Sequence, residues 1–269
     1  MKTFLFIFLF FAHSACAAQT LTFDLAKDGD RISRASNQMP VKKYGFNDNV
    51  GASLEDIWSG GATYTGWLTV AKYVRVAAGG NVNDTAAGTG CREVTAQGLD
   101  SSWVALTFTV ATNGALASDS SSIKAFRINR AYCSDVGTYG GTPAGDVTIE
   151  TTDGTVLAIV EASSGQTEMS MYTVEAGHAL VVESLETSVN SANAANIEWF
   201  FRPGANVTAA PFSGARLFHR TPDLTGAWQT ELDGTVVFDQ YTDVWVRALR
   251  TAGSSASVST TMIGRLVRK

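Results

Sequence analysis

The chain has 269 residues, of which only 17% are charged, and its formal net charge is −5. This length allows one large or two modest hydrophobic cores. The acidic balance, without any cluster of Lys or Arg, argues against a nucleic-acid binder, which needs a basic surface to displace counterions. A composition with 25 Gly and abundant Thr, Val, Ser and Ala favours β-structure.

Residues 1–18 have the pattern of an export signal. Met1-Lys2-Thr3 is short and positive, residues 4–11 are unbroken apolar, and Ala15-Cys16-Ala17 fits a cleavage site. The apolar run is shorter than the roughly 20 residues of a membrane-spanning helix. We therefore expect a cleaved secretory signal. Two alternatives stay open: Cys16 as a lipid-modified first residue, although His13 stands where a bacterial lipoprotein signal usually has Leu, and an uncleaved apolar segment packed inside an assembly.

Residues 19–65 are predicted to form an extended arm. A short apolar run at Leu21, Phe23 and Leu25 precedes a charged stretch and carries no longer periodic pattern. One helical turn is expected from Ser53 to Trp58, with Ser53 as the capping residue, before Gly60-Gly61 ends it.

Residues 66–164 are predicted to form a first β-sandwich. Between residues 104 and 111, apolar side chains alternate with small or polar ones, which is typical of a strand with one face in a core. Asn113-Gly114 follows at once and predicts a hairpin, because this dipeptide tolerates the positive φ of a type I′ turn. Further strands are expected at residues 68–75, 126–133, 146–150 and 156–160. A polar break at residues 163–165 sets the boundary.

Residues 165–269 are predicted to form a second, jelly-roll-like sandwich. Short strands recur at intervals close to those of such folds, and Ile197, Trp199 and Phe201 alternate with more polar neighbours. Asp233-Gly234 is expected to be a turn between two of these strands. No helix of normal length is predicted after residue 60. The predicted class is therefore all-β, with two tandem antiparallel β-sandwich domains.

Two cysteines remain if Cys16 leaves with the signal. In regular strands, Cys91 would lie on the face opposite Val94, and Cys133 on the face opposite Ile128. Both would then point away from the core, where a disulfide between neighbouring strands is one hypothesis and two unrelated small residues the other. No second cysteine pair at ligand spacing indicates a metal site.

Catalytic, cofactor and metal sites are not predicted. His178 and His219 have contexts that indicate solvent or hydrogen-bonding roles, and the chain lacks a nucleophile elbow, a zinc-binding helix motif and a phosphate loop. A glycosidase needs only two carboxylates, and Glu183 with Glu186, or Glu55 with Asp56, are the candidate pairs. The acidic residues between positions 135 and 146 admit a calcium site, but a plain Gly-rich loop explains them better.

Six tryptophans raise a carbohydrate-binding interpretation, since exposed rings stack on sugars. Trp199 and Trp245 lie in strongly apolar strands and are expected in the core. Trp103, just after a turn, is the best of the six as a candidate for an exposed ligand-stacking ring, but its position at the start of a strand favours a packing role.

Several motifs occur in an order that resembles a family of virion structural proteins of tailed phages, especially marine ones. The resemblance spans roughly residues 40–269. Its motifs are Asp56-Ile57-Trp58 with Gly60-Gly61, Asp84-Thr85, Gly88-Thr89-Gly90, Gly98-Leu99-Asp100, Asn113-Gly114, Phe126-Arg127-Ile128-Asn129-Arg130-Ala131, Gly145-Asp146-Val147-Thr148-Ile149, Gly165-Gln166-Thr167 and Tyr172-Thr173-Val174-Glu175-Ala176-Gly177. The export signal and the two cysteines depart from the family's pattern.

The resemblance implies a two-sandwich component of a virus particle, in the head decoration, neck or tail, with no catalytic residues. Its expected partners are other copies of itself and other particle proteins, with a host-surface glycan as a further candidate and no nucleic acid. Its expected location is the virion. The alternative is a secreted, lectin-like module, supported by the signal and the tryptophans, and a third hypothesis is a secreted hydrolase.

Overall fold

The computed structural model describes residues 38–190 and 192–269. All regular secondary structure elements among these residues are β-strands, which confirms the predicted all-β class. The strands are β1 (Gln38–Val50), β2 (Glu55–Asp56), β3 (Lys72–Val76), β4 (Cys91–Asp100), β5 (Ala105–Ala111), β6 (Lys124–Val136), β7 (Val147–Thr151), β8 (Val156–Val160), β9 (Met171–Thr173), β10 (His178–Val189), β11 (Ala194–Arg202), β12 (Arg216–Leu224), β13 (Gly226–Asp239), β14 (Asp243–Ala252) and β15 (Ala256–Arg268). The described part of the chain holds no helix long and apolar enough to cross a membrane. The predicted signal at residues 1–18, and the arm up to residue 37, lie outside the described residues.

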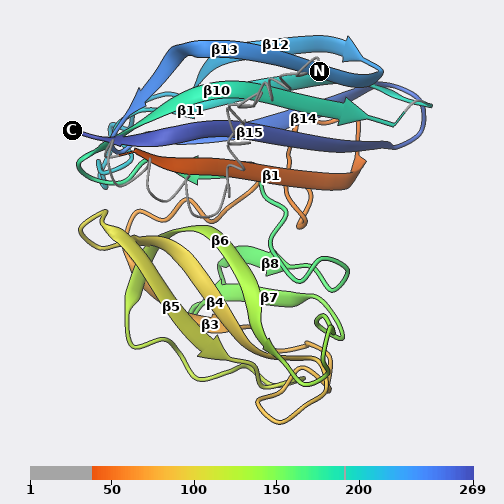
Figure 1. The fold of residues 1–269 in the computed structure, drawn as a ribbon, viewed down its shortest axis with the longest axis vertical. Coiled ribbons are helices and arrows are strands. Elements are labelled where there is room, and N and C mark those ends of the chain that lie inside the picture. The colour runs from red at the N-terminus through yellow and green to blue at the C-terminus, as the bar shows by residue number, and fades with distance from the viewer. Residues whose placement is uncertain (1–37, 191) are drawn as a thin grey trace, which may run out of the picture. The chain divides into compact units, whose positions relative to one another are not determined.

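The strands form three antiparallel sheets (Figure 1). A four-stranded sheet has the order β1-β15-β10-β13, and a five-stranded sheet has the order β12-β11-β14-β2 with β9 also paired to β14. The third sheet has six strands in the order β5-β4-β6-β3-β7-β8. This arrangement is consistent with β-sandwich domains, as the sequence predicted.

The four- and five-stranded sheets enclose one hydrophobic core, which includes Leu180, Leu185, Ile197 and Trp199. Ile197 and Trp199 are 0% and 1% exposed, so the alternation read in residues 197–201 does mark the inner face of a strand. Burying such side chains is the main stabilising term of the sandwich.

The six-stranded sheet curls around a second core. β3 pairs with β6 through Lys72 and Tyr73 and then crosses to pair with β7. Isolated bridges join Gln166 to β6 and Thr167 to β8. Residues 166–167 therefore lie between β6 and β8 and cover the open side of β8.

The two cores meet at β14. Val244 and Val246 belong to the core of the sandwich, whereas Trp245 between them packs into the core of the six-stranded sheet. Trp245 is 8% exposed, so it lies in a core as predicted, although not in the same core as Trp199. Both faces of β14 are thus covered, which explains its continuous apolar run.

The region predicted as an arm contains two strands instead of a helical turn. β1 carries residues 38–50, and Glu55 and Asp56 pair with β14. The helical turn expected at Ser53 to Trp58 is wrong, because pairing with β14 holds this backbone extended. Gly45 of β1 lies so close to Ser170 that an added Cβ would be 2.2 Å from its Oγ, which requires glycine there.

Two predicted turns also need correction. Asn113-Gly114 does not form a hairpin, because β5 and β6 pair with opposite sides of β4 rather than with each other. Gly114 does have a positive φ of 62°, but its N–H donates to Asp84 in another loop. Asp233-Gly234 lies inside β13, where the pairing register with β10 shifts, instead of separating two strands.

Candidate functional site

A buried ionic cluster joins the six-stranded sheet to the five-stranded sheet. Asp243 of β14 accepts from Arg127 of β6 at 3.1 Å (Nε to Oδ1) and 3.3 Å (Nη2 to Oδ2). Arg202 of β11 donates to the same carboxylate at 2.5 Å from Nη2 and 3.2 Å from Nε. The side chains of Asp243 and Arg127 are 0% and 4% exposed, and that of Arg202 is 28% exposed. Two guanidinium groups thus share one carboxylate, which leaves one positive charge in excess.

Strand register places these groups around Asp243. Arg202 on β11 and Thr173 on β9 each lie directly opposite Asp243, on its two sides. The Thr173 hydroxyl donates to Asp243 Oδ1 at 2.6 Å. Cross-strand neighbours are close enough to interact directly, so the carboxylate is held on both sides within its own sheet, and Arg127 reaches it from the six-stranded sheet.

Asn129 provides a second polar link between the same two parts. Its side chain accepts a hydrogen bond from Thr173 N at 3.0 Å and donates one to Thr173 O at 3.3 Å, as the backbone of a neighbouring strand would. The Asn129 carbonyl accepts a hydrogen bond from the Lys43 ammonium of β1. Burial, with a smaller contribution from Arg130, lowers the pKa of Lys43 to about 7.

A cavity of about 240 Å³ lies beside the ionic cluster. Its lining includes Trp67, Arg127, Arg202, Phe212 and Ser213. The Arg202 guanidinium lies 5.4 Å from the centre of the Trp67 ring, and Phe212 is 53% exposed. An excess positive charge beside aromatic rings and a hydroxyl suits a small ligand with a carboxylate and an apolar face.

Trp103 packs against the sheet, as its position at the start of a strand favoured, and is not an exposed ligand-stacking ring. It is 6% exposed and stacks on Phe126, with ring centres 4.5 Å apart. The Asp100 carboxylate accepts from the N–H groups of Ser102 and Val104, and Trp103 has a positive φ of 64° within this turn. The turn therefore folds the indole back onto the sheet, where it lies 5.2 Å from the Arg127 guanidinium.

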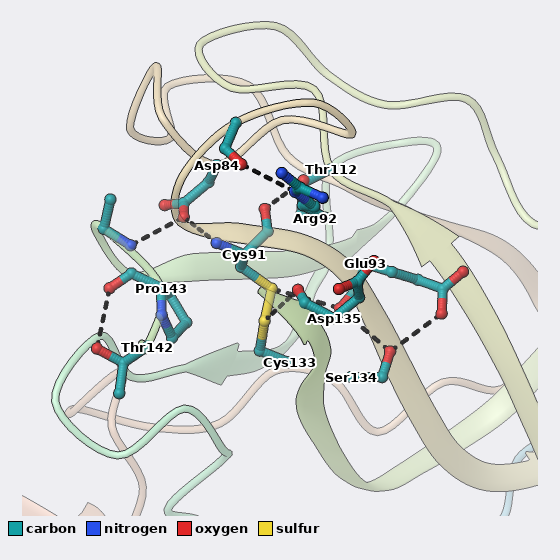
Figure 2. Close-up of a disulfide and its surroundings, with 12 residues drawn as sticks. Asp84, Cys91, Arg92, Glu93, Thr112, Cys133, Ser134, Asp135, Thr142 and Pro143 are labelled. Atoms are coloured by element: carbon teal, nitrogen blue, oxygen red, sulfur yellow. Dashed lines mark hydrogen bonds between the residues drawn. A yellow bond between two sulfur atoms is a disulfide. The ribbon is translucent and has the colours of Figure 1, made fainter. Parts of the chain in front are cut away.

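Cys91 and Cys133 are joined by a disulfide between neighbouring strands (Figure 2). The expected outward direction of both side chains is wrong: Cys91 is 0% exposed and lies in the core of the six-stranded sheet, and Cys133 packs against that core. At two register shifts between β4 and β6 a β-bulge leaves one residue without an opposite residue: Arg92 on β4 and Asn129 on β6. Each bulge reverses the alternation of faces, so both cysteines point inward.

Sequence reasoning missed the buried carboxylate of Asp84, next to the disulfide. Asp84 is 2% exposed and accepts from the N–H groups of Cys91 at 2.6 Å, Ala144 at 2.8 Å and Gly145 at 3.0 Å. It thereby ties the start of β4 to the Gly-rich loop before β7 (Figure 2). Three donors balance the cost of burying the charge, but a single Asp between loop residues gives no sequence signal of this role.

Three of the four carboxylates considered for hydrolysis have structural partners. Glu183 forms an ion pair with Arg265 at 3.0 Å, and Glu55 accepts from Gly51 N at 3.1 Å. Burial raises the pKa of Asp56 to about 6, although Tyr64 N donates to it and Arg247 lies nearby. The contacts of Glu55 and Asp56 hold the segment that pairs with β14.

His178 and His219 make local contacts. His178 Nδ1 lies 3.0 Å from Ala176 O, and the His219 ring stacks on Trp228 with centres 4.7 Å apart. Burial lowers the pKa of His219. In the part of the chain that the structure describes, no group of three or more His, Cys, Asp or Glu side chains is arranged to hold a metal ion.

The outer edge of β5 differs from the other long sheet edges. β5 ends the six-stranded sheet and contains neither a charged residue nor a proline. The edge strand β1 contains Pro40, Lys42 and Lys43. The edge strand β12 contains Arg216, Arg220 and Pro222. Natural sheets use such residues to prevent pairing with other chains. β5 lacks this protection.

Comparison with models of known protein families and with curated proteins finds no match to this chain.

Proposed function

We propose that this chain is a structural component of a virus particle, in the head decoration, neck or tail, and that it acts through contacts with copies of itself and with other particle proteins. The observation that carries the proposal is the open, uncharged edge of β5. A long unprotected edge exposes a monomeric protein to aggregation, whereas a subunit of an assembly can use it to pair with another chain. The ordered motifs that resemble virion proteins of tailed phages support the same assignment.

The joined cores also support a structural role. Trp245 and its neighbours on β14 pack into both cores, and the Arg127–Asp243 ion pair adds a buried polar link. Two cores packed on opposite faces of one strand resist relative motion of the two parts more than a small polar interface would.

Isolation of the natively produced protein tests this proposal. Lysates or culture fluid are fractionated on a density gradient, and the chain is identified in the fractions by mass spectrometry. We expect it in a fast-sedimenting particle fraction that withstands nuclease and salt washes. Recovery only in the slow-sedimenting soluble fraction would overturn the particle assignment and the virion location.

The second candidate is a secreted, lectin-like module, and the cavity beside Arg202 is the observation that favours it. The disulfide also suits an oxidising compartment. An array of neutral and acidic glycans, probed with the full chain and with Arg202→Gln, tests this function. Binding of carboxylate-bearing sugars that the variant loses would favour the module, whereas equal signals for both proteins would exclude this cavity as the site.

A further inference from the structure

The sequence of β5 is nearly the same in both directions. It reads Ala105-Leu106-Thr107-Phe108-Thr109-Val110-Ala111, so Phe108 is the centre and each flanking residue has an identical or similar counterpart. An antiparallel pair of two such strands, centred on Phe108, would place Ala opposite Ala, Thr opposite Thr and Leu opposite Val. A two-fold symmetric interface requires a surface that matches itself in this way.

Among the described residues, the backbone groups of β5 that have no hydrogen-bond partner lie on its open edge. At the two ends of its pairing with β4, Asp100 N donates to Val104 O and Thr112 N donates to Arg92 O, each at 3.0 Å. Hydrogen-bonded and non-hydrogen-bonded positions alternate along an antiparallel pair. Leu106, Phe108 and Val110 therefore bond to β4, and the remaining residues direct their N–H and C=O groups outward. These are Ala105, Thr107, Thr109 and Ala111.

There is room for a strand along this edge. An open groove of about 500 Å³ at this edge is lined by residues 109–113 and 118–122. Ser and Thr predominate in its lining, and Asp119 is its one charged residue. In a pair centred on Phe108, the partner's Val104 would lie opposite Thr112 and enter the groove. Val104 is 51% exposed in the single chain.

We propose that two copies of this chain pair through β5, antiparallel and centred on Phe108, so that their six-stranded sheets join into one continuous sheet. This inference rests on the proposed structural function and names the contact that it uses. The outward N–H and C=O groups of Thr107 would exchange hydrogen bonds with Thr109 of the second copy, and the reverse. The absence of charge on the strand removes the repulsion that like-with-like pairing would otherwise create.

Introducing like charges at two exposed positions tests the pairing. Thr107 and Thr109 point away from the core and are exposed. In Thr107→Lys/Thr109→Lys, every lysine faces a lysine of the other copy, and in Thr107→Glu/Thr109→Glu every glutamate faces a glutamate. Ala227→Lys/Gln229→Lys is the matched control, because both positions are exposed on the edge strand β13. Sedimentation velocity of the full chain over a concentration series measures association, and circular dichroism verifies the fold.

We expect the wild-type chain and the β13 control to associate alike. The dissociation constant of each β5 variant alone should be at least about tenfold higher than that of wild type, since like charges directly opposite destabilise a pair. Mixing the two β5 variants should restore association, which a misfolded protein could not do. If the β5 variants associate like wild type, or the mixture stays monomeric, the pairing is overturned while the proposed function stands. A wild-type chain that is monomeric at every concentration, yet sediments with particles when natively produced, would overturn the pairing alone.

Discussion

Arg127 of β6 and Asp243 of β14 are 116 residues apart in the chain and form a two-point ion pair that is almost fully buried. Each charge is also held by other groups: Arg127 donates to the carbonyls of Leu68 and Phe126, and Asp243 accepts from Arg202 and Thr173. These additional hydrogen bonds matter, because a buried ion pair is tolerated only when the remaining hydrogen-bonding capacity of both groups is satisfied.

Removal of one partner of this pair should destabilise the fold strongly. We expect Arg127→Met to lower the free energy of unfolding by about 3–5 kcal/mol, since it removes one of the partners of a buried carboxylate. Urea unfolding measures the change. Arg220→Met is the control, because Arg220 is 48% exposed in its ion pair with Glu198 and should contribute less than about 1 kcal/mol. Equal losses in the two variants would contradict the role given to the buried cluster.

Lys43 should make stability depend on pH above neutrality. Its pKa is about 7 in the folded chain, against an ordinary value of 10.5, so between these values the unfolded chain holds a proton that the folded chain releases. The free energy of unfolding should therefore rise with pH over this window, by on the order of a few kcal/mol, and reach a low plateau below pH 7.

Urea unfolding at pH 7 and pH 10 tests this expectation. Lys43→Met should remove most of the rise, whereas Lys42→Met should keep it, because Lys42 is exposed on the opposite face of β1. A rise of the same size in wild type and Lys43→Met would show that another group is responsible.

The disulfide should be present and stabilising in the natively produced protein. Cys91 and Cys133 are 42 residues apart, a loop whose closure stabilises a fold by about 4 kcal/mol in the chain-entropy model. Intact mass should increase by about 2 Da on reduction, which is the mass of the two hydrogens gained. Reducing agent should lower the stability of wild type and leave Cys133→Ser unchanged, and an unchanged wild type would contradict this account.

Local patterns in the sequence predicted the strands that have one apolar face. Residues 104–111 and 197–201 alternate as strands with one buried face should, and the structure has β5 and β11 there. β1 escaped prediction because its buried face consists largely of Lys43, Gly45 and Asn47, whose burial depends on partners elsewhere in the chain. Hydrophobic periodicity cannot detect a strand whose inward positions are polar.

The candidate site was less predictable than the fold. The bulges at Arg92 and Asn129 each add a single residue to a strand and have no sequence mark, yet they turn both cysteines inward. Asp243 receives its partners from β6, β9 and β11, and only tertiary pairing brings these together. The sequence left two roles open for Trp103, because the direction of its ring depends on one positive φ in a turn.

Amide hydrogen exchange of β5 at low and high protein concentration tests the central claim, pairing between copies, most directly. The amides of Thr107 and Thr109 face the open edge, whereas that of Phe108 between them bonds to β4 and serves as an internal control. We expect the Thr107 and Thr109 amides to exchange fast in dilute solution and slowly at high concentration, with Phe108 slow in both. Exchange of Thr107 and Thr109 that is equally fast at both concentrations would contradict the account.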